Sequence, residues 1–193
     1  MTEITSDKKK IAMMAAKAFS GIPDVVRYWD DNKNNFVDLL TCNDQPQIGV
    51  SSYSTIGVSD VTNLVGKKAI DIRVELVGAC SSSVIEFPNI LSTAAFCIIN
   101  SAWSCYPGAI FPNIISMYKC SKTMQHLLFS SPFLWENKLK TLEFKERKLA
   151  WLLAIPISEE ELKYAEINGV DQLERLFEVH QIDIFNIERS SVV

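Results

Sequence analysis

An alternation of apolar and polar side chains runs through residues 70–77, Ile70-Asp71-Ile72-Arg73-Val74-Glu75-Leu76-Val77. In an extended chain its apolar residues fall on one face, and Asp71, Arg73 and Glu75 fall on the other. This period of two predicts a strand that is buried on one face. Gly78-Ala79 is expected to end it.

A long apolar segment follows the strand, from Val84 to Trp103. Its apolar residues recur at intervals of three and four, which predicts a helix. Ser81 to Ser83 are candidate N-cap residues, and Pro88 is early enough to lie in the first turn or to form a modest kink. A helix that is apolar on nearly every side belongs in the interior, so we expect a sheet to pack against it.

The rest of the chain supplies further strands and outer helices. Helices are predicted over Thr5–Ser20, from Ser158 to about Ile167 and over Val170–Val179. Strands are predicted over 25–29, 36–40, 51–58, 113–118, 125–129 and 148–157. The segment 182–187 is either a last short strand or an extended tail. The predicted fold is of the mixed α/β (α+β) class, with one mixed, mostly antiparallel sheet and helices packed on both faces. We expect residues 1–21 to form an N-terminal helix packed on a single globular domain of residues 22–193.

Composition excludes several classes of protein. With 193 residues, 48% of them hydrophobic and 22% charged, the chain is long and apolar enough to bury a core. A net charge of -4 argues against a nucleic-acid partner. The cysteines are odd in number and form no Cys-x-x-Cys pair, which is typical of free thiols in a reducing compartment. The apolar run 11–16 is too short for a signal peptide or a membrane span, so we expect a cytoplasmic protein with no membrane partner.

No catalytic or metal-binding constellation is visible. His126 and His180 are far apart and lack metal-ligand spacing, and neither a P-loop nor a G-x-S-x-G motif occurs. Cys105 lies beside a turn, but the sequence shows no base to activate it. We therefore expect no enzyme activity, no catalytic residue, no cofactor and no metal. A small hydrolase or transferase that uses Cys105 or a carboxylate pair is the alternative.

Aromatic residues in predicted loops are the main candidates for partner binding. The predicted partner-binding residues are Trp103, Tyr106 and Phe111 in a loop with two prolines and a glycine, Phe133 and Trp135 in a second aromatic segment, and Asp60 after the third strand. We expect the first loop to present an aromatic centre with Asp60 on an acidic rim. Alternatively, these aromatics pack beneath their loops and Asp60 only caps a turn.

Five ordered motifs carry a resemblance to a known family. They are Tyr53-Ser54-Thr55-Ile56-Gly57-Val58-Ser59-Asp60, Arg73-Val74-Glu75-Leu76-Val77, Pro107-Gly108 with Phe111-Pro112-Asn113, Pro132-Phe133-Leu134-Trp135-Glu136, and Trp151-Leu152-Leu153-Ala154-Ile155-Pro156-Ile157-Ser158. Over residues 20 to 190 the chain resembles the suppressor-of-fused domain family, and within it the short bacterial members that act as antitoxins of Bacillus-type toxin-antitoxin pairs. The resemblance implies a mixed sheet with helices on both sides and a protein-binding function without catalytic residues.

Three functions follow as hypotheses. The first is an immunity protein that binds and occludes a cognate protein toxin, with a nuclease as the favoured toxin class because an acidic protein is attracted to a site built for a polyanion. The second is the hydrolase or transferase named above. The third is a regulatory adaptor that binds a transcription factor. Exposed strand edges also allow a homodimer.

Overall fold

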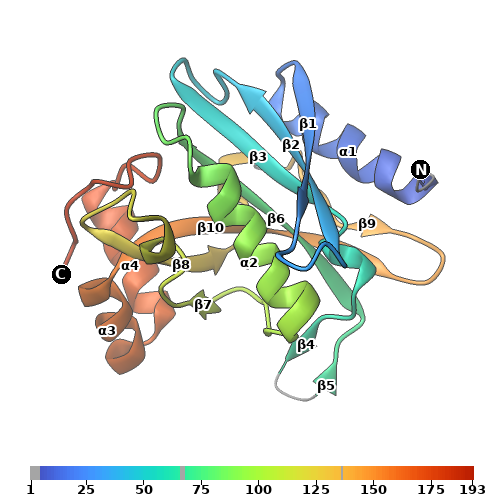
Figure 1. Ribbon diagram of the computed structural model, residues 1–193. Helices are drawn as coiled ribbons and strands as arrows, with labels where there is room; N and C mark the ends of the chain where they lie inside the picture. Colours follow the sequence, from blue (N-terminus) through green and yellow to red (C-terminus); the bar gives the residue numbers. More distant parts are fainter. Residues whose placement is uncertain (1–4, 66–67, 136) are drawn as a thin grey trace.

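A computed structural model of the protein describes residues 5–65, 68–135 and 137–193. Its main sheet has the strand order β1-β2-β3-β6-β10-β8-β7, with β9 paired to β10, and a separate pair is formed by β4 and β5 (Figure 1). The strands are β1 (Pro23–Trp29), β2 (Phe36–Asn43), β3 (Val50–Ile56), β4 (Leu64–Val65), β5 (Lys68–Ala69), β6 (Ile72–Ser81), β7 (Ile110–Phe111), β8 (Met124–Ser130), β9 (Leu142–Glu143) and β10 (Lys148–Ser158). β6 and β10 are parallel, and the other described pairs are antiparallel.

Helices cover both faces of this sheet. α2 (Phe87–Ser101) lies on one face, whereas α1 (Ser6–Phe19), α3 (Glu159–Asn168) and α4 (Val170–His180) lie on the other (Figure 1). One apolar cluster joins α2 to the sheet, and a second joins α1, α3 and α4 to its opposite face. The predicted fold class is therefore confirmed, and the strand predicted over 148–157 is β10, which lies between β6 and β8.

The apolar helix is buried as predicted, but it begins later. Seven residues of α2 are buried, and its first residue is Phe87 with Pro88 in the first turn. Ser81 to Ser83 do not cap it, because Ser81 still belongs to β6 and its hydroxyl pairs with that of Ser83 at 2.8 Å. The N-cap is Glu86, which makes no side-chain capping bond.

The prediction that Gly78-Ala79 ends the strand is wrong. β6 continues to Ser81, and Gly78 pairs with Tyr53 of β3. The glycine is required by packing, since a Cβ atom there would lie 2.9 Å from Cε1 of Phe87. A small residue in the centre of β6 thus lets the first turn of α2 approach the sheet closely.

Other boundaries differ in smaller ways. Residues 113–118 form a turn and a 3-10 helix, η2 (Ser116–Tyr118), because the positive φ of Asn113 (61°) is incompatible with a strand. α1 ends at Phe19, one residue before the predicted end, and its C-cap Ser20 is in the left-handed conformation. Residues 182–187 are a tail without strand pairing. Gly66, Lys67 and Glu136, the last of which belongs to the motif over 132–136, lie outside the described residues.

The predicted starts of the other three helices are confirmed. The Thr5 side chain accepts a hydrogen bond from the Lys8 backbone N–H at the start of α1. Ser158 and Glu161 form a capping box at the start of α3, and Gly169 separates α3 from α4. The five cysteines are free thiols, as the odd count suggested.

Candidate partner-binding surface

Glu75 is buried in the structure, where it organises the turn that follows β3. Its predicted place on a polar face is wrong, because β6 is covered on both faces and Glu75 is completely buried. The carboxylate accepts hydrogen bonds from the backbone N–H groups of Gly57, Val58 and Ser59 and from the hydroxyls of Thr55 and Ser59, at 2.6–3.3 Å. Burial raises its pKa, whereas these donors oppose the shift. Glu75 therefore fixes the turn that leads into η1 (Val58–Asp60).

Asp60, at the end of this turn, is surrounded by basic side chains. Its carboxylate lies 3.0 Å from Lys8 Nζ and 3.3 Å from an Arg147 Nη atom, and its carbonyl accepts a bond from Arg73 at 3.0 Å. Asp7 is a further, weaker partner of Arg147 at 3.6 Å. These cations offset its charge, so Asp60 ties α1 and the β9–β10 end of the sheet to η1 and is a poor source of an acidic rim.

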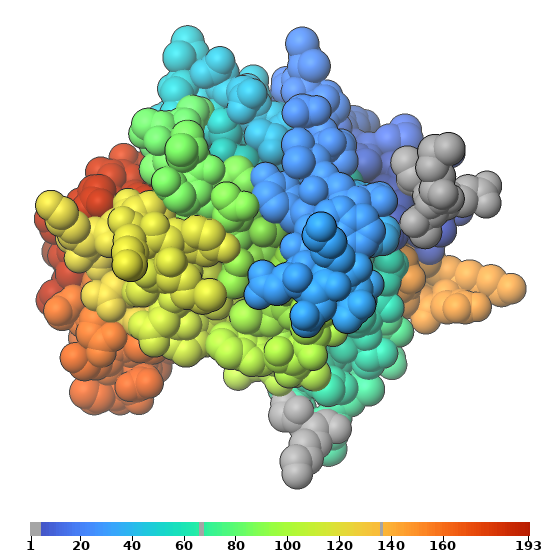
Figure 2. All heavy atoms as spheres, viewed as in Figure 1, coloured from blue at the N-terminus to red at the C-terminus, as the bar shows by residue number. Residues whose placement is uncertain are grey.

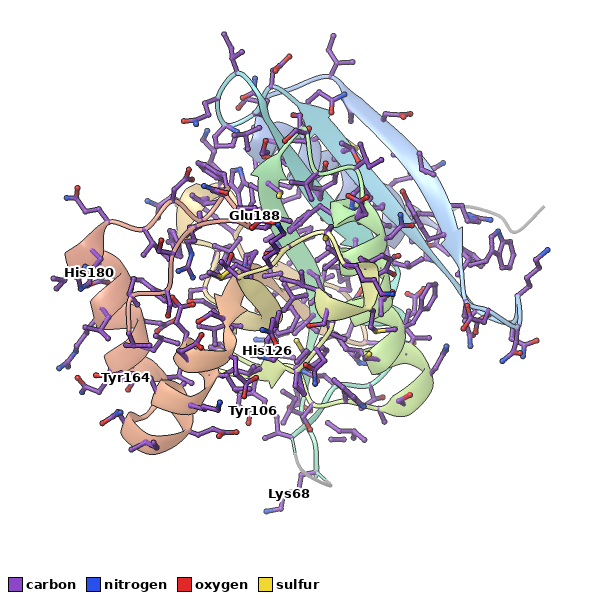
Figure 3. All side chains as sticks on the ribbon, turned by 60° about the vertical axis from the view of Figure 1, so that its left-hand side comes forward. Lys68, Tyr106, His126, Tyr164, His180 and Glu188 are labelled. Carbon is purple, nitrogen blue, oxygen red and sulfur yellow. The ribbon has the colours of Figure 1, made fainter. Side chains whose placement is uncertain are left out.

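The backbone of the loop after α2 is held by hydrogen bonds at both ends. The Asn63 side chain donates to the Cys105 carbonyl (2.6 Å) and accepts from the Cys105 N–H (3.3 Å), and Gly108 N–H donates to the Phe129 carbonyl (2.7 Å). Between these anchors Tyr106 is 41% exposed. Figure 3 shows Tyr106 between α3 and the β4–β5 pair. The loop thus displays Tyr106 on a fixed backbone.

The other predicted aromatics divide into exposed and buried residues. Trp103 and Phe133 are 36% and 47% exposed, whereas Phe111 and Trp135 are buried at 2% and 3%. Phe111 packs edge-on against Trp103 and Phe129, and Trp135 packs on Phe19 of α1 at 4.7 Å. Phe111 and Trp135 are core residues beneath their loops, and their assignment as displayed aromatics is wrong.

Three depressions place Tyr106 and Phe133 on the same side of the molecule. One of about 310 Å³ has both Tyr106 and Pro132 in its wall, so the two loops are neighbours. A second of about 290 Å³ joins Tyr106 to Glu166 of α3, and a third of about 400 Å³ joins Phe133 to Glu174 and Glu178 of α4. We name this surface, made of Tyr106, Phe133, Glu166, Glu174 and Glu178, the acidic-aromatic face.

The acidic side of this face was missed from sequence, although a signal for it was present. Residues 159–193 contain nine Asp or Glu and only three Lys or Arg, although the whole chain has a net charge of only -4. Glu166 and Glu178 are exposed, and Glu174 accepts a hydrogen bond from Ser130. Counting charge by segment rather than over the whole chain would have indicated α3 and α4 as the acidic rim.

The remaining candidate reactive groups are structural or isolated. Cys105 is fully buried, and burial raises the pKa of its thiol, which opposes formation of a nucleophilic thiolate. His126 is also buried; its Nδ1 accepts from Asn113 N–H (2.8 Å), and its Nε2 faces Glu159 at 3.1 Å. His180 lies at the exposed end of α4. The described residues include no group of three or more His, Cys, Asp or Glu side chains arranged to hold a metal.

A larger depression, of about 510 Å³, lies away from the acidic-aromatic face. It is bounded by the C-terminal tail and by the ends of β3 and β6, and its wall contains Glu86, Asp183 and Glu188. The tail is bonded to the sheet there through Ser81 N–H and the Phe185 carbonyl (2.9 Å). The aromatic residue in its wall, Phe185, is only partly exposed, so this depression is a weaker candidate for a protein-binding site than the acidic-aromatic face.

Among the described helices, none has both the length and the apolar character needed to span a bilayer.

Comparison with known proteins identifies the family. Residues 33–190 match the family model for suppressor of fused protein (SUFU). The chain belongs to this family. It is 49% identical over 190 residues to the immunity protein YqcF of Bacillus subtilis (strain 168), an alignment that covers 98% of this chain and 99% of YqcF.

Solved structures with lower sequence identity share the fold. A SUFU homologue from Neisseria gonorrhoeae FA 1090 has a TM-score of 0.69 at 14% identity, with 98% of both chains covered. A chain of the Sufu-Fu complex has a TM-score of 0.63 at 15% identity, with 95% of this chain and 91% of that chain covered. Drosophila Suppressor of Fused has a TM-score of 0.60, and the match spans 94% of this chain but 50% of that one.

Proposed function

We propose that this chain is an immunity protein, which binds a cognate protein toxin and neutralises it by occluding the toxin's active site. The observation that carries the proposal is the 49% identity to immunity protein YqcF over nearly the full length of both chains. The buried, unactivated Cys105 weighs against the alternative of a cysteine hydrolase.

We further propose that the acidic-aromatic face contacts the toxin. Tyr106 and Phe133 are exposed aromatics, the residue type that most often forms the centre of a protein interface. Both stand on backbone that is fixed by hydrogen bonds, so little conformational entropy is lost when a partner binds. Trp103, which is partly exposed, and Asp60, which is neutralised by Lys8 and Arg147, are peripheral to this proposal.

The carboxylates of the face support a nuclease as the toxin. A nuclease site carries cations that receive phosphate groups, and Glu166, Glu174 and Glu178 would face such cations. Charge complementarity of this kind mainly accelerates association and is weakened by salt. The proposal thus accounts for the acidic character of α3 and α4 in a chain whose other residues carry a small positive charge.

Growth rescue tests the immunity function. The protein encoded by the neighbouring reading frame is expressed in a bacterial host, with and without this chain, and we expect co-expression to restore growth. Failure of rescue together with no complex between the two purified proteins would refute the pairing. Cleavage of DNA or RNA by the purified neighbour, blocked at a stoichiometric amount of this chain, would identify it as a nuclease.

Variants of the face test where the toxin binds. Tyr106→Ala should weaken binding by more than about 1 kcal/mol with little change in melting temperature. Glu178→Lys should slow association, most strongly at low salt. Glu146→Lys is the matched control, because Glu146 is an exposed glutamate in a different depression, beside Arg147 and Lys148. If both lysine variants slow association equally, net charge rather than the acidic-aromatic face is responsible.

A further inference from the structure

β1 forms an edge of the main sheet, and no strand of the described residues pairs with its outer side. Six of its seven residues are exposed, and Val25, Val26 and Trp29 remain 49%, 46% and 49% accessible. Figure 2 shows the blue segment that contains β1 on the surface toward the viewer, and Figure 3 shows the β1–β2 hairpin at the outer border of the molecule. An edge with apolar side chains on both faces is suited to pairing with another strand.

The direction of the free backbone groups follows from the pairing with β2. Asp30 N–H donates to the Asn35 carbonyl at 3.0 Å, and this pair continues the β1–β2 register in which Trp29 faces Phe36. Because hydrogen-bonded pairs alternate along an antiparallel ladder, the even-numbered residues of β1 bond to β2 and the odd-numbered residues direct their N–H and C=O groups outward. The hydrogen bond of Val25 supports this assignment, because its N–H donates to the Asp24 carboxylate at 2.9 Å and not to β2.

We propose that β1 pairs antiparallel with β1 of a second copy of this chain, about a two-fold axis at Val26. This register uses the whole strand Pro23–Trp29. It places Val25 opposite Arg27 of the second copy, so that the outward groups of these residues form hydrogen-bonded pairs. It places Val26 opposite Val26 of the second copy in a non-hydrogen-bonded pair, where side chains approach most closely.

Charge and backbone chemistry favour this register over its neighbours. A shift of the centre to Arg27 would bring the two Arg27 side chains together and would place Asp24 opposite Asp30, and like charges directly opposite are destabilising. A shift of the centre to Val25 would leave Trp29 without a partner strand residue. In the register centred on Val26, Trp29 N–H instead meets the carbonyl of Pro23, a residue that has no N–H to satisfy.

Asp24 opposes this association in the free protein. Its carboxylate already satisfies the Val25 N–H, so it must turn away before a second strand can accept that bond. The inference therefore predicts a weak dimer, which tightens when Asp24 is replaced by a residue that cannot accept the bond.

Cysteine cross-linking tests the register. A non-hydrogen-bonded pair separates Cα atoms by about 4.5 Å, within the range for a disulfide. Under mild oxidation, Val26→Cys should give a reducible dimer on a gel in higher yield than Val25→Cys, the matched control, which is equally exposed but faces Arg27. The wild type measures the background from its five native thiols. Equal yields from the two variants would overturn the proposed pairing.

Sedimentation equilibrium of the full chain tests the association without cross-links. Asp24→Ala should lower the dimer dissociation constant several-fold, and Val26→Lys, which places two ammonium groups at the two-fold axis, should give a monomer at every concentration. If the wild type and Asp24→Ala are both monomeric up to the highest concentration measured, the second copy is not the occupant of this edge. The experiment involves no toxin, so its result is independent of the proposed immunity function.

Discussion

Replacement of Glu75 by alanine should destabilise the fold severely. The substitution leaves the backbone N–H groups of Gly57, Val58 and Ser59 without an acceptor in a site that is closed to solvent. Each buried donor left unsatisfied costs about 1–3 kcal/mol. Because removal of the side chain lets the turn relax or admit water, and ends the burial of a carboxylate, we expect a net loss of about 3–5 kcal/mol, near the low end of the summed cost.

Urea unfolding followed by circular dichroism measures this loss. Glu146→Ala is the control, because Glu146 is exposed and surface substitutions usually change stability by less than about 0.5 kcal/mol. A loss below about 1 kcal/mol for Glu75→Ala would refute the role of the carboxylate as the acceptor that holds the turn.

The dependence of stability on pH tests the same site independently. Burial raises the pKa of Glu75 in the folded protein above its ordinary value of 4.5, so the folded state binds the proton more tightly than the unfolded chain does. The corresponding stabilisation is fully present below the unfolded pKa and is lost as pH rises through the folded pKa. Glu75→Gln cannot titrate there. The stability of the wild type relative to Glu75→Gln should therefore fall as pH rises, and a relative increase would contradict the raised pKa.

Two further substitutions test the packing and the C-terminal tail. Gly78→Ala should lower the free energy of unfolding by about 1–3 kcal/mol, measured in urea, because its Cβ would lie 2.9 Å from Cε1 of Phe87. An unchanged urea midpoint would show that the Phe87 ring can move aside at no cost. Arg189→Ala should cost about 3–5 kcal/mol, because it leaves the fully buried Glu161 carboxylate without the guanidinium that binds it at 2.6 and 2.8 Å; a variant as stable as the wild type would show that the tail is dispensable.

The layers of this fold are predictable from the sequence because the segments that form its core are long and almost continuously apolar. The helix against the sheet and the strand over 148–157 are both recovered, since each buries a continuous apolar segment. The strand over 70–77 shows the limit of this reasoning. Its alternation indicates one solvent-exposed face, whereas Glu75 is buried among donors from residues 55–59. A partner about 20 residues away is set by strand pairing, which local periodicity does not encode.

The candidate surface is predictable only in part, for a similar reason. The candidate aromatics all lie in short segments that the sequence predicts as irregular: Tyr106, Phe111, Phe133 and Trp135. The sequence does not show which of these side chains are exposed and which are buried. In the structure Phe111 enters the core through the β7–β8 pairing and Trp135 packs on α1, while Tyr106 and Phe133 stay exposed. Whether a loop aromatic points inward depends on which element crosses beneath it, and that depends on the tertiary fold.

The buried polar networks hold this fold without help from its exposed side chains. Glu75 fixes the turn before η1, and the Glu161–Arg189 pair ties the start of α3 to the tail. These networks hold the backbone without using exposed side chains such as Tyr106 and Glu178. Substitution of an exposed residue that makes no buried contact changes stability little, so such positions can vary with the partner while the scaffold stays fixed. The same reasoning separates the two kinds of variant above, because changes at Glu75 or Arg189 should abolish binding only through unfolding, whereas changes on the acidic-aromatic face should alter binding in a folded protein.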